Sequence, residues 1–453
     1  MAKITDKYRR FAVIGAARSG VAVAKLLVNS GYEVYLSDAG NPETFFLKQI
    51  EELKIGYEFG GHSDRIYNYD AMVVSPGISR NSEVIRNAFA KGIEVFSEIE
   101  IASWFSKGKI IAVTGTNGKT TTTTLIGKIF SDAQYHTLVC GNIGKPFSDV
   151  VTDTREDSVI VLEASSFQLE NIKYFKPMIA IFLNLTPDHL DRHNTMEEYR
   201  DAKMMITRNQ DINDHFIYNY DDGMIKNYVN QKVNARLSAF SKTSEVKKAT
   251  TSGAYLNNYD LIYYYYKGEE KIVNTQNMIL KGLHNHYNSM AGAIAARISG
   301  IDAKLIQKSL ENFRGVEHRL EFVRDVNGIK FYNDSKATNV NSVWYALNSF
   351  DEKIILILGG VDKGNDYGEI AEVVREKVKH IVALGESKKS IIGYFKDIVK
   401  ASSADDMEDA IYKAAGEARK GEIVLLSPAC ASFDMFKNYE ERGNEFKRIV
   451  NSL

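Results

Sequence analysis

One unit recurs along this chain of 453 residues: a short run of Val, Ile and Leu, then a loop rich in Gly, Ser, Thr or Asp, then a stretch with helical spacing. Because the apolar runs are continuous rather than alternating, the strands that they predict should be buried on both faces. Helices must then cover mostly parallel sheets, and ligands bind beyond the carboxyl ends of such strands. The strands predicted in this way span residues 11–14, 72–74, 110–113, 159–162, 179–183, 354–358, 381–384 and 423–426.

Three blocks are predicted from the places where this pattern restarts. Residues 1–107 close after the helical stretch SEIEIASWF, residues 108–314 open with KIIAVTGTNGKT, and residues 315–453 open near NFRGVEHRLE and lead into a strand at 328–333. The stretch 241–276 is rich in Tyr and Lys and less regular, which fits a small β insertion in the second block. We therefore expect an α/β protein of three domains.

Charge and composition exclude several classes of function. The chain has 57 basic and 58 acidic residues and no long basic run, so nothing indicates a nucleic-acid partner or an anionic membrane. No apolar segment has the length of a membrane span or the form of a signal peptide, so we expect no membrane insertion. Cys140 and Cys430 make no disulfide framework and are expected to be small buried side chains. A cytoplasmic protein is predicted.

The strongest functional signal is the loop GTNGKT, which follows the apolar strand IIAV and precedes the helical pattern TTTTLIGKIF. Backbone N–H groups at a helix N-terminus point at an anion, and glycines let the backbone approach a phosphate closely. Lys119 can reach the β and γ phosphates and Thr120 can reach Mg²⁺. A standard Walker A sequence would have Gly in place of Val113, and the alternative is a plain glycine turn. The predicted ATP site contains Gly115, Thr116, Asn117, Gly118, Lys119, Thr120 and Thr121.

Candidate metal ligands follow the next two strands. Glu163 ends the apolar run VIVLE, where a carboxylate beside a phosphate loop can hold Mg²⁺, although a solvated carboxylate is an equal alternative. The run MIAIFLNL leads into the segment 186–193, TPDHLDRH, the densest cluster of ionisable side chains in the chain. This cluster lacks the Cys ligands and the His spacing of a zinc site. It favours a metal or phosphate role for His189.

The first block carries a weaker signal, the pattern Gly15-x-Ala17-x-x-Gly20 between a strand and a helix, with Asp38 at the end of the following strand. This is close to a dinucleotide-binding fingerprint and by itself suggests an NAD enzyme. The same geometry binds any diphosphate, including that of a UDP-sugar. The loop 75–78 follows another strand and could extend the pocket. The alternative is that these glycines only pack.

Three loops of the third block mix hydroxyl groups, small residues and a Lys or Asp. They span residues 333–339, 359–364 and 427–433, and each follows a predicted strand. Cations and hydroxyl donors suit a small molecule that carries carboxylates. Any one of these loops could be an ordinary turn, but three after parallel strands predict one composite pocket.

Five motifs, in order and over nearly the whole chain, resemble those of the Mur ligase family. They are GTNGKT, LEASSFQLE, NLTPDHLDRH, GLHNHYNS and EHRLE. The motifs NDSKATN, GGVDKG and SPACASFDMFKNYEERG resemble its D-glutamate-adding member. The resemblance implies a Rossmann-like N-terminal domain that binds the UDP substrate, a central P-loop ATPase domain with a mostly parallel sheet, and a Rossmann-like C-terminal domain. It also implies ATP and two Mg²⁺ ions as cofactors, and we expect a monomer.

The family's site residues carry over by position. The resemblance implies that Lys119, Glu163, His189 and Lys203 are catalytic, with Thr120, Glu163, His189 and a carbamoylated Lys203 as metal ligands. The remaining ATP contacts implied are Asn285, Asn288, Arg319 and Asp334. The implied UDP-substrate contacts are Gly15, Arg18, Ser19, Asp38, Gly77, Asn142 and His189. The implied D-glutamate contacts are Lys336, Thr338, Lys363, Ser432 and Tyr439.

The reaction implied by the resemblance has two steps. The L-alanyl carboxylate of UDP-N-acetylmuramoyl-L-alanine attacks the γ-phosphoryl group of ATP, and the amine of D-glutamate then attacks the acyl phosphate. The nearest rival is a related ligase, folylpolyglutamate synthase, against which the N-terminal block and SPACAS argue. An NAD-dependent dehydrogenase leaves GTNGKT unexplained. A non-catalytic nucleotide-binding regulator leaves Glu163 and the His189 cluster unexplained.

Overall fold

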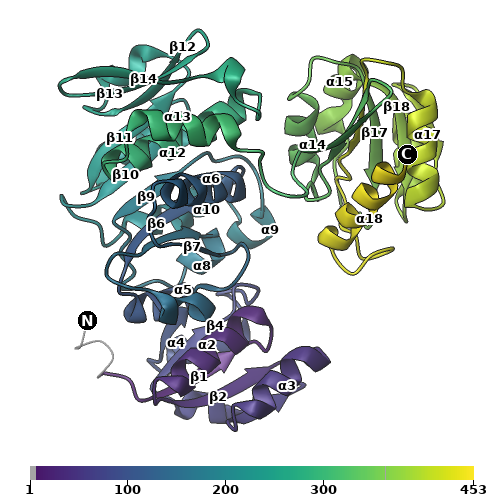
Figure 1. Cartoon of the computed structure of the whole chain (residues 1–453). Helices are drawn as coiled ribbons and strands as arrows, with labels where there is room; N and C mark the ends of the chain where they lie inside the picture. The colour runs from purple at the N-terminus through teal and green to yellow at the C-terminus, as the bar shows by residue number, and fades with distance from the viewer. Residues whose placement is uncertain (1–6, 363) are drawn as a thin grey trace. The chain divides into compact units, whose positions relative to one another are not determined.

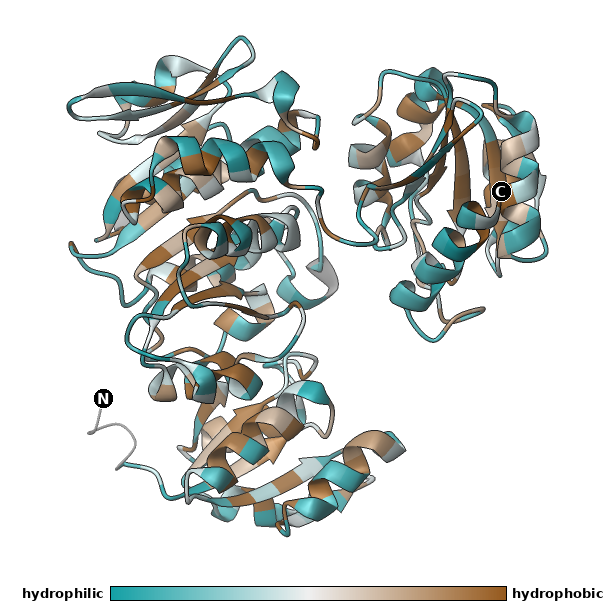
Figure 2. Cartoon of the chain, in the orientation of Figure 1, coloured by the Kyte–Doolittle hydropathy of each residue, from teal (hydrophilic) through white to brown (hydrophobic). Residues whose placement is uncertain are grey.

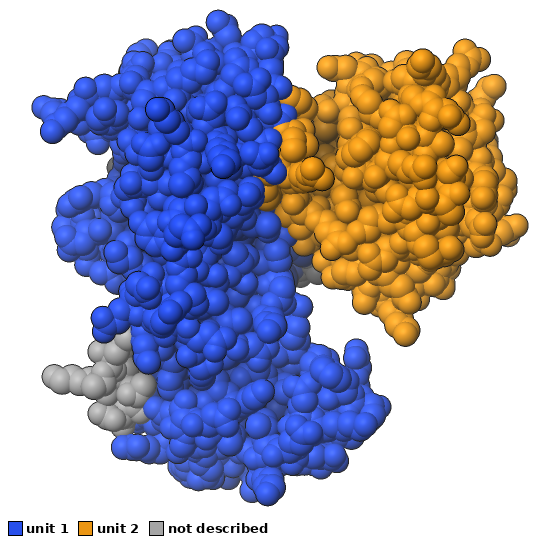
Figure 3. All heavy atoms as spheres, in the orientation of Figure 1, with its two compact units in different colours: residues 1–278, 287–312 blue, residues 279–286, 313–453 orange. Residues whose placement is uncertain are grey.

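The computed structural model describes residues 7–362 and 364–453, which form three sheets covered by helices (Figure 1). The chain divides into two compact units, residues 1–278 with 287–312 and residues 279–286 with 313–453 (Figure 3). The first unit contains the first two sheets, and the second unit contains the third sheet. The predicted α/β class with three sheet-based domains is confirmed, while the boundaries at 107 and 314 stay predictions.

The first sheet has five parallel strands in the order β3-β2-β1-β4-β5. Its strands are β1 (Arg10–Ile14), β2 (Glu33–Asp38), β3 (Gly56–Phe59), β4 (Ala71–Val74) and β5 (Glu94–Ser97). Its helices are α2 (Arg18–Asn29), α3 (Thr44–Glu52), η1 (Asp64–Asn68), α4 (Glu83–Ala90) and α5 (Glu98–Phe105). Ile14, at the end of β1, lies in register with Ser37 and Val74, so the loops after β1, β2 and β4 meet at one edge.

The central sheet has nine strands in the order β14-β13-β12-β11-β10-β9-β6-β8-β7. Its strands are β6 (Lys109–Thr114), β7 (Thr137–Gly141), β8 (Val159–Glu163), β9 (Ile179–Phe182), β10 (His215–Asn219), β11 (Arg236–Ser241), β12 (Gly253–Asn257), β13 (Asp260–Tyr265) and β14 (Gly268–Asn274). Only β12, β13 and β14 pair antiparallel. The expected β insertion within 241–276 is therefore an antiparallel extension of the parallel sheet.

Helices and short 3₁₀ turns surround the central sheet. They are α6 (Lys119–Asp132), α7 (Phe147–Val150), η2 (Val151–Asp153), α8 (Ser166–Leu169), α9 (Leu190–His193), α10 (Met196–Met204), η3 (Met205–Thr207), α11 (Gly223–Lys232), η4 (Ser244–Lys248), η5 (Thr275–Asn277), α12 (Leu283–Ile298) and α13 (Ala303–Asn312).

The third sheet has six strands in the order β15-β16-β20-β17-β18-β19, and only β15 runs antiparallel to its neighbour. The strands are β15 (Glu321–Val326), β16 (Ile329–Asn333), β17 (Ile354–Gly359), β18 (Val378–Leu384), β19 (Lys400–Ser403) and β20 (Ile423–Leu426). The helices are α14 (Val340–Leu347), α15 (Gly368–Lys377), α16 (Lys388–Phe395), α17 (Met407–Glu417) and α18 (Tyr439–Ser452). One buried apolar cluster joins α14, α15 and α16 to the sheet, and another joins α17 and α18 to its other face.

The hydropathy of the chain explains these layers. The central strands are apolar along their length, whereas the helices are apolar on one side and polar on the other (Figure 2). All eight strands predicted from continuous apolar runs are present and buried, which confirms the parallel-sheet interpretation. Cys140 and Cys430 are both buried and free, as predicted. Within the described residues, no helix has the length and apolar character needed to cross a membrane.

Candidate functional site

The loop between β6 and α6 adopts backbone conformations that require glycine. Gly115 has φ +151° and Gly118 has φ +80°, and α6 begins directly afterwards at Lys119. A Cβ at Gly118 would lie 2.5 Å from the side-chain oxygen of Asn288 on α12, so this helix packs closely against the loop. The loop therefore presents backbone at a helix N-terminus, which is the geometry that receives phosphate.

The loop is held from the neighbouring strand by a residue that sequence reasoning missed. Asn184, two residues beyond β9, accepts a hydrogen bond from Asn117 N (2.8 Å) and donates one to Asn117 O (3.0 Å) through its side-chain amide. Thr116 Oγ1 accepts from Thr186 N (3.1 Å) in the same segment. In the sequence, Asn184 is recognisable only as an Asn after an apolar strand. Its contact with the phosphate loop depends on β9 lying beside β6, and this strand order cannot be predicted from the sequence.

The ammonium group of Lys119 lies over this loop. Its Nζ donates to Gly115 O (2.9 Å) and to Thr116 O (2.7 Å), while Thr120 and Thr121 are buried at the start of α6. A cation, a helix N-terminus and hydroxyl groups thus gather at one point. This is the combination that binds the phosphates of a nucleotide.

A second lysine approaches the same loop from α10. Lys203 is 1% exposed, and its Nζ donates to Gly115 O at 2.8 Å. Burial, together with the nearby charge of Lys119, holds the pKa of Lys203 well below its ordinary value. The lowered pKa favours the neutral amine over the ammonium form. Only a neutral amine can react with CO₂ to form a carbamate, so the predicted modification fits this residue.

The predicted metal ligand Glu163 is also buried, at the end of β8. It is 2% exposed; its Oε1 accepts a hydrogen bond from Asn142 Nδ2 (2.9 Å), while its Oε2 has no hydrogen-bond donor among the described residues. A buried carboxylate oxygen without a partner is costly, and a bound cation would satisfy it. The residue therefore fits a magnesium site better than the solvated carboxylate that was the alternative.

His189 occupies the exposed segment after β9. It has φ +54°, its side chain is 49% exposed, and its Nε2 lies 3.5 Å from a carboxylate oxygen of Asp188. The described residues contain no group of three His, Cys, Asp or Glu side chains arranged for a metal ion. A complete ligand set near Glu163 would thus need groups of other kinds, such as the Thr120 hydroxyl or a carbamate on Lys203.

The predicted UDP-substrate residues lie at the carboxyl edge of the first sheet. Gly15 has φ +105°, and a Cβ at Gly20 would lie 1.8 Å from the Gly15 carbonyl oxygen, so both glycines are required for packing. Asp38 accepts hydrogen bonds from Ala16 N (2.6 Å) and from Gly40 N (2.8 Å), which braces the loop after β1. Asp38 therefore has a structural role whether or not it contacts a ligand.

This edge is connected to the central sheet. Arg18 Nη1 donates to Gly144 O at 3.0 Å, in the same loop as Asn142, the partner of Glu163. Ser19 is half-buried beside Arg18, and Gly77 is exposed in the loop after β4. The first unit thus contains polar contacts that lead from the first sheet to the loop of Asn142 and on to Glu163.

In the second unit, Asp334 lies at the end of β16 and is fully enclosed. It accepts hydrogen bonds from Ser427 Oγ (2.8 Å) and Leu320 N (3.2 Å), and burial raises its pKa to about 7. The positive charge of Arg319 counteracts this rise. Arg319 and Asp334 belong to the same unit, and their shared assignment to one ligand stays a prediction.

The predicted D-glutamate residues flank the same strand ends. Lys336 Nζ lies 5.6 Å from the centre of the Tyr439 ring, Ser432 is buried and Thr338 is half-buried. Lys363 lies outside the described residues. Sequence reasoning missed Arg442 on α18, which donates to Ser335 O (2.8 Å) and Cys430 O (3.1 Å) and so connects the loops after β16 and β20. In the sequence, Arg442 is one charged residue in a polar helix, and nothing there indicates that it contacts two loops.

The remaining predicted ATP residues are on α12. Asn288 belongs to the first unit and packs against Gly118, whereas Asn285, one turn earlier, belongs to the second unit with Arg319 and Asp334. Asn285 is buried, and its Nδ2 donates to Lys281 O at 2.8 Å. The functions of all these residues stay predictions.

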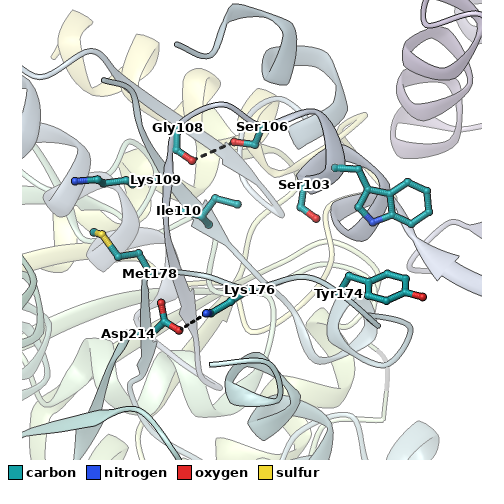
Figure 4. Close-up of a pocket in the computed structure, with 10 residues that line it drawn as sticks. Ser103, Ser106, Gly108, Lys109, Ile110, Tyr174, Lys176, Met178 and Asp214 are labelled. Carbon is teal, nitrogen blue, oxygen red and sulfur yellow. Dashed lines mark hydrogen bonds and ion pairs between the residues drawn. The ribbon is translucent and has the colours of Figure 1, made fainter. Parts of the chain in front are cut away.

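A cavity of about 270 Å³ lies at the opposite edge of the central sheet. It is lined by residues that precede or begin strands, including Ile110, Met178 and Asp214, together with Ser103 and Ser106 at the end of α5 (Figure 4). Lys176 at its wall pairs with Asp214 (3.1 Å). Because nucleotides bind beyond carboxyl ends, this cavity is separate from the phosphate loop.

Three family models match the chain. They are the MurD N-terminal domain over residues 10–84, the Mur ligase middle domain over residues 113–296 and the Mur ligase, glutamate ligase domain over residues 318–430.

Full-length relatives and solved structures agree with these matches. The UDP-N-acetylmuramoylalanine--D-glutamate ligase of Salinibacter ruber is 44% identical, with 98% of each chain covered, and that of Chloroherpeton thalassium is 43% identical, with 99% covered. Among solved structures, the fold is similar to that of the UDP-N-acetylmuramate-alanine ligase MurC of Thermotoga maritima (TM-score 0.59, 20% identity, 98% and 99% covered). It is also similar to that of MurF ligase from the same organism in complex with ADP (TM-score 0.60, 16% identity, 93% and 95% covered).

Proposed function

The chain belongs to the Mur ligase family, and from this premise we propose that it is the ATP-dependent ligase that adds D-glutamate to UDP-N-acetylmuramoyl-L-alanine. Relatives over 40% identical along almost the entire chain carry the name of this activity. The proposed products are the extended nucleotide sugar, ADP and phosphate, made during peptidoglycan synthesis. We place the chain in the cytoplasm as a monomer.

The observation that carries the proposal is the group of titratable side chains around one glycine loop. Lys119 and Lys203 both donate to the carbonyl group of Gly115, and Glu163 has a buried oxygen for which the described residues provide no donor. Two Mg²⁺ ions would be held by Thr120, Glu163, His189 and a carbamoylated Lys203. Their positive charge would offset the repulsion of the phosphates and a carboxylate. This charge pattern suits phosphoryl transfer to an acid better than hydride transfer or passive nucleotide binding.

The first step needs two anions to approach each other. Lys119 and the N–H groups of the phosphate loop neutralise the triphosphate and keep the γ-phosphoryl group in line with the L-alanyl carboxylate. Asn142, which donates to Glu163, is within the loop reached by Arg18 and so orients the nucleotide sugar toward the phosphate loop. Asn288 supports the loop from α12, and Asn285, Arg319 and Asp334 bind the rest of ATP.

The second step needs an amino acid of defined charge. Lys336 and Lys363 pair with the two carboxylates of D-glutamate, while Thr338 and Ser432 donate hydrogen bonds and Tyr439 packs against its side chain. The Lys336–Tyr439 contact supports a pocket at the carboxyl edge of the third sheet. The amine then attacks the acyl phosphate, its C–N bond forms, and phosphate leaves.

The test is phosphate release by the purified chain with ATP, Mg²⁺ and UDP-N-acetylmuramoyl-L-alanine against a panel of D- and L-amino acids. We expect release with D-glutamate alone, together with one equivalent of a new amide detected by mass spectrometry. Turnover with a folate substrate instead would favour the folylpolyglutamate synthase alternative. Oxidation of NADH without phosphate release would favour the dehydrogenase. Absence of both amide and phosphate would refute the proposed function.

A further inference from the structure

Arg192, in the segment after β9, is the side chain that connects the first sheet to the loop carrying His189. It donates from Nη1 to Pro76 O (2.7 Å) and from Nη2 to Ile78 O (3.1 Å), both in the loop after β4. Its Nη2 also donates to Glu170 Oε2 (2.9 Å), and the side chain of Arg192 is only 12% exposed. A buried guanidinium with three acceptors on two domains is a fixed connection, unlike an exposed ion pair.

The two carbonyl bonds determine how the loop after β4 presents its amides. In a trans peptide the C=O of one residue and the N–H of the next point in opposite directions. All described peptide bonds are trans. Because Pro76 O and Ile78 O face Arg192, the N–H groups of Gly77 and Ser79 must face away from it. Arg192 thereby fixes the direction of two donors in a loop proposed to bind the nucleotide sugar.

The other side of Arg192 is joined to the proposed metal site through one aromatic ring. Its guanidinium lies 3.9 Å from the centre of the Phe167 ring, and the His189 ring is edge-on to the same ring at 4.9 Å. His193 stacks on Phe167 at 5.6 Å and is fixed by Ser166 Oγ at 3.0 Å.

The backbone around Phe167 is also anchored. Helix α8 carries Phe167, ends beside Glu170 and begins three residues after Glu163. A capping box at Ser165 stabilises the N-terminus of this helix. Arg192 therefore contacts Phe167, the ring that His189 also meets, and Glu170, at the two ends of a segment that begins three residues after Glu163.

We propose that Arg192 is a positioning residue that couples the loop 75–78 to the His189 segment, so that the nucleotide sugar and the metal–ATP complex each strengthen the binding of the other. This inference rests on the proposed function. Loss of Arg192 frees the loop amides and the His189 segment separately, while the phosphate loop and the amino-acid pocket keep their own contacts. Such coupling is reciprocal, and it is measured as a ratio of dissociation constants.

The experiment measures the dissociation constant of UDP-N-acetylmuramoyl-L-alanine by calorimetry, alone and with Mg²⁺ plus a non-hydrolysable ATP analogue. In the unmodified protein we expect binding to be roughly tenfold tighter with the analogue. In Arg192→Ala, the ratio of the dissociation constant without the analogue to that with the analogue should fall to about one. In Glu170→Gln, which leaves both carbonyl contacts of Arg192, this ratio should fall only in part. Arg155→Ala removes an exposed cation of the same domain and should leave the ratio unchanged.

Two results would overturn the coupling: a ratio of one in the unmodified protein, or an undiminished ratio in a folded Arg192→Ala. If Arg192→Ala does not fold, Arg192→Lys replaces it, since lysine keeps the charge but loses the planar fork and the stacking on Phe167. An undiminished ratio in Arg192→Lys would then refute the inference. In steady state, the KM for the nucleotide sugar should rise while that for D-glutamate stays constant. A protein that binds the nucleotide sugar but has no ligase activity would contradict the proposed function instead.

Discussion

Replacing Glu98 by glutamine should change the pH dependence of stability in a calculable direction. Glu98, at the start of α5, is fully buried; Oε1 accepts a hydrogen bond from Ser148 N (2.6 Å), and Oε2 has no donor among the described residues. Burial raises the pKa of this carboxyl to about 7, the charge of Asp149 adds to the rise, and Ser148 and Arg18 oppose it. In the folded protein, Glu98 therefore keeps its proton at pH values at which the unfolded chain loses it.

The sign follows from proton counting. Between the unfolded pKa of 4.5 and the folded value of about 7, the folded state binds more protons, so stability falls as pH rises through this window and stays low above it. The difference, 7 − 4.5 = 2.5 pKa units, corresponds to about 3 kcal/mol at 1.36 kcal/mol per unit. The glutamine side chain in Glu98→Gln cannot ionise and keeps the acceptor for Ser148 N. The variant should gain up to about 3 kcal/mol over the unmodified protein between pH 5 and pH 8.

The assay is thermal and urea unfolding of both proteins at pH 5 and pH 8. The quantity compared is the difference in unfolding free energy between the variant and the unmodified protein at each pH, from which the contributions of other titrating groups cancel. The matched contrast is Glu100→Gln. Glu100 is equally buried, but its two oxygens accept from Trp104 Nε1 and from the N–H groups of Lys173, Tyr174 and Phe175. An amide NH₂ there would face donors, so this variant should lose about 2 kcal/mol at pH 8. Equal pH profiles for Glu98→Gln and the unmodified protein would refute the reasoning.

Three further substitutions test the proposed sites. Lys119→Ala should lower kcat by about 100- to 1,000-fold while the Tm changes little, because the side chain is partly exposed and its Nζ donates to the Gly115 and Thr116 carbonyl groups of its own loop; near-normal turnover of the folded variant would exclude the phosphate-loop assignment. Asn184→Ala removes both amide contacts with Asn117 and should raise the KM for ATP about tenfold, measured with the other substrates saturating; an unchanged KM would contradict its supporting role. Lys363→Ala should mainly raise the KM for D-glutamate, and a rise confined to ATP would show that the amino-acid pocket is misassigned.

Parallel strands were predictable because burial on both faces leaves a direct trace in composition. Ile354–Gly359, for example, is apolar from end to end, as a strand between two helical layers must be. Short, partly exposed strands such as β3 (Gly56–Phe59) and β19 (Lys400–Ser403) have no such trace, because edge strands need only one apolar face. Their positions come from tertiary pairing.

The candidate site was predictable where local backbone geometry determines the residue type. Gly118 and Lys119 can be recognised because a left-handed turn before a helix needs glycine and a phosphate needs a cation. Asn184 and Arg442 could not be recognised, since each acts by joining loops that only the sheet order brings together. The sequence likewise does not reveal the hydrogen bonds of Asp38. These bonds decide whether Asp38 braces its own loop or contacts a ligand.

The antiparallel extension β12–β14 has a consequence for how the molecule behaves in a crowded solution. Without it, the parallel strand β11 would form the rim of the central sheet and present unpaired backbone groups to other chains. The hairpin moves the rim to β14, which carries Glu269, Glu270 and Lys271. All three charges are paired, Glu269 with Lys247, Glu270 with Arg297 and Lys271 with Asp260. The Tyr- and Lys-rich stretch of the sequence thus shields the molecule from strand-to-strand aggregation.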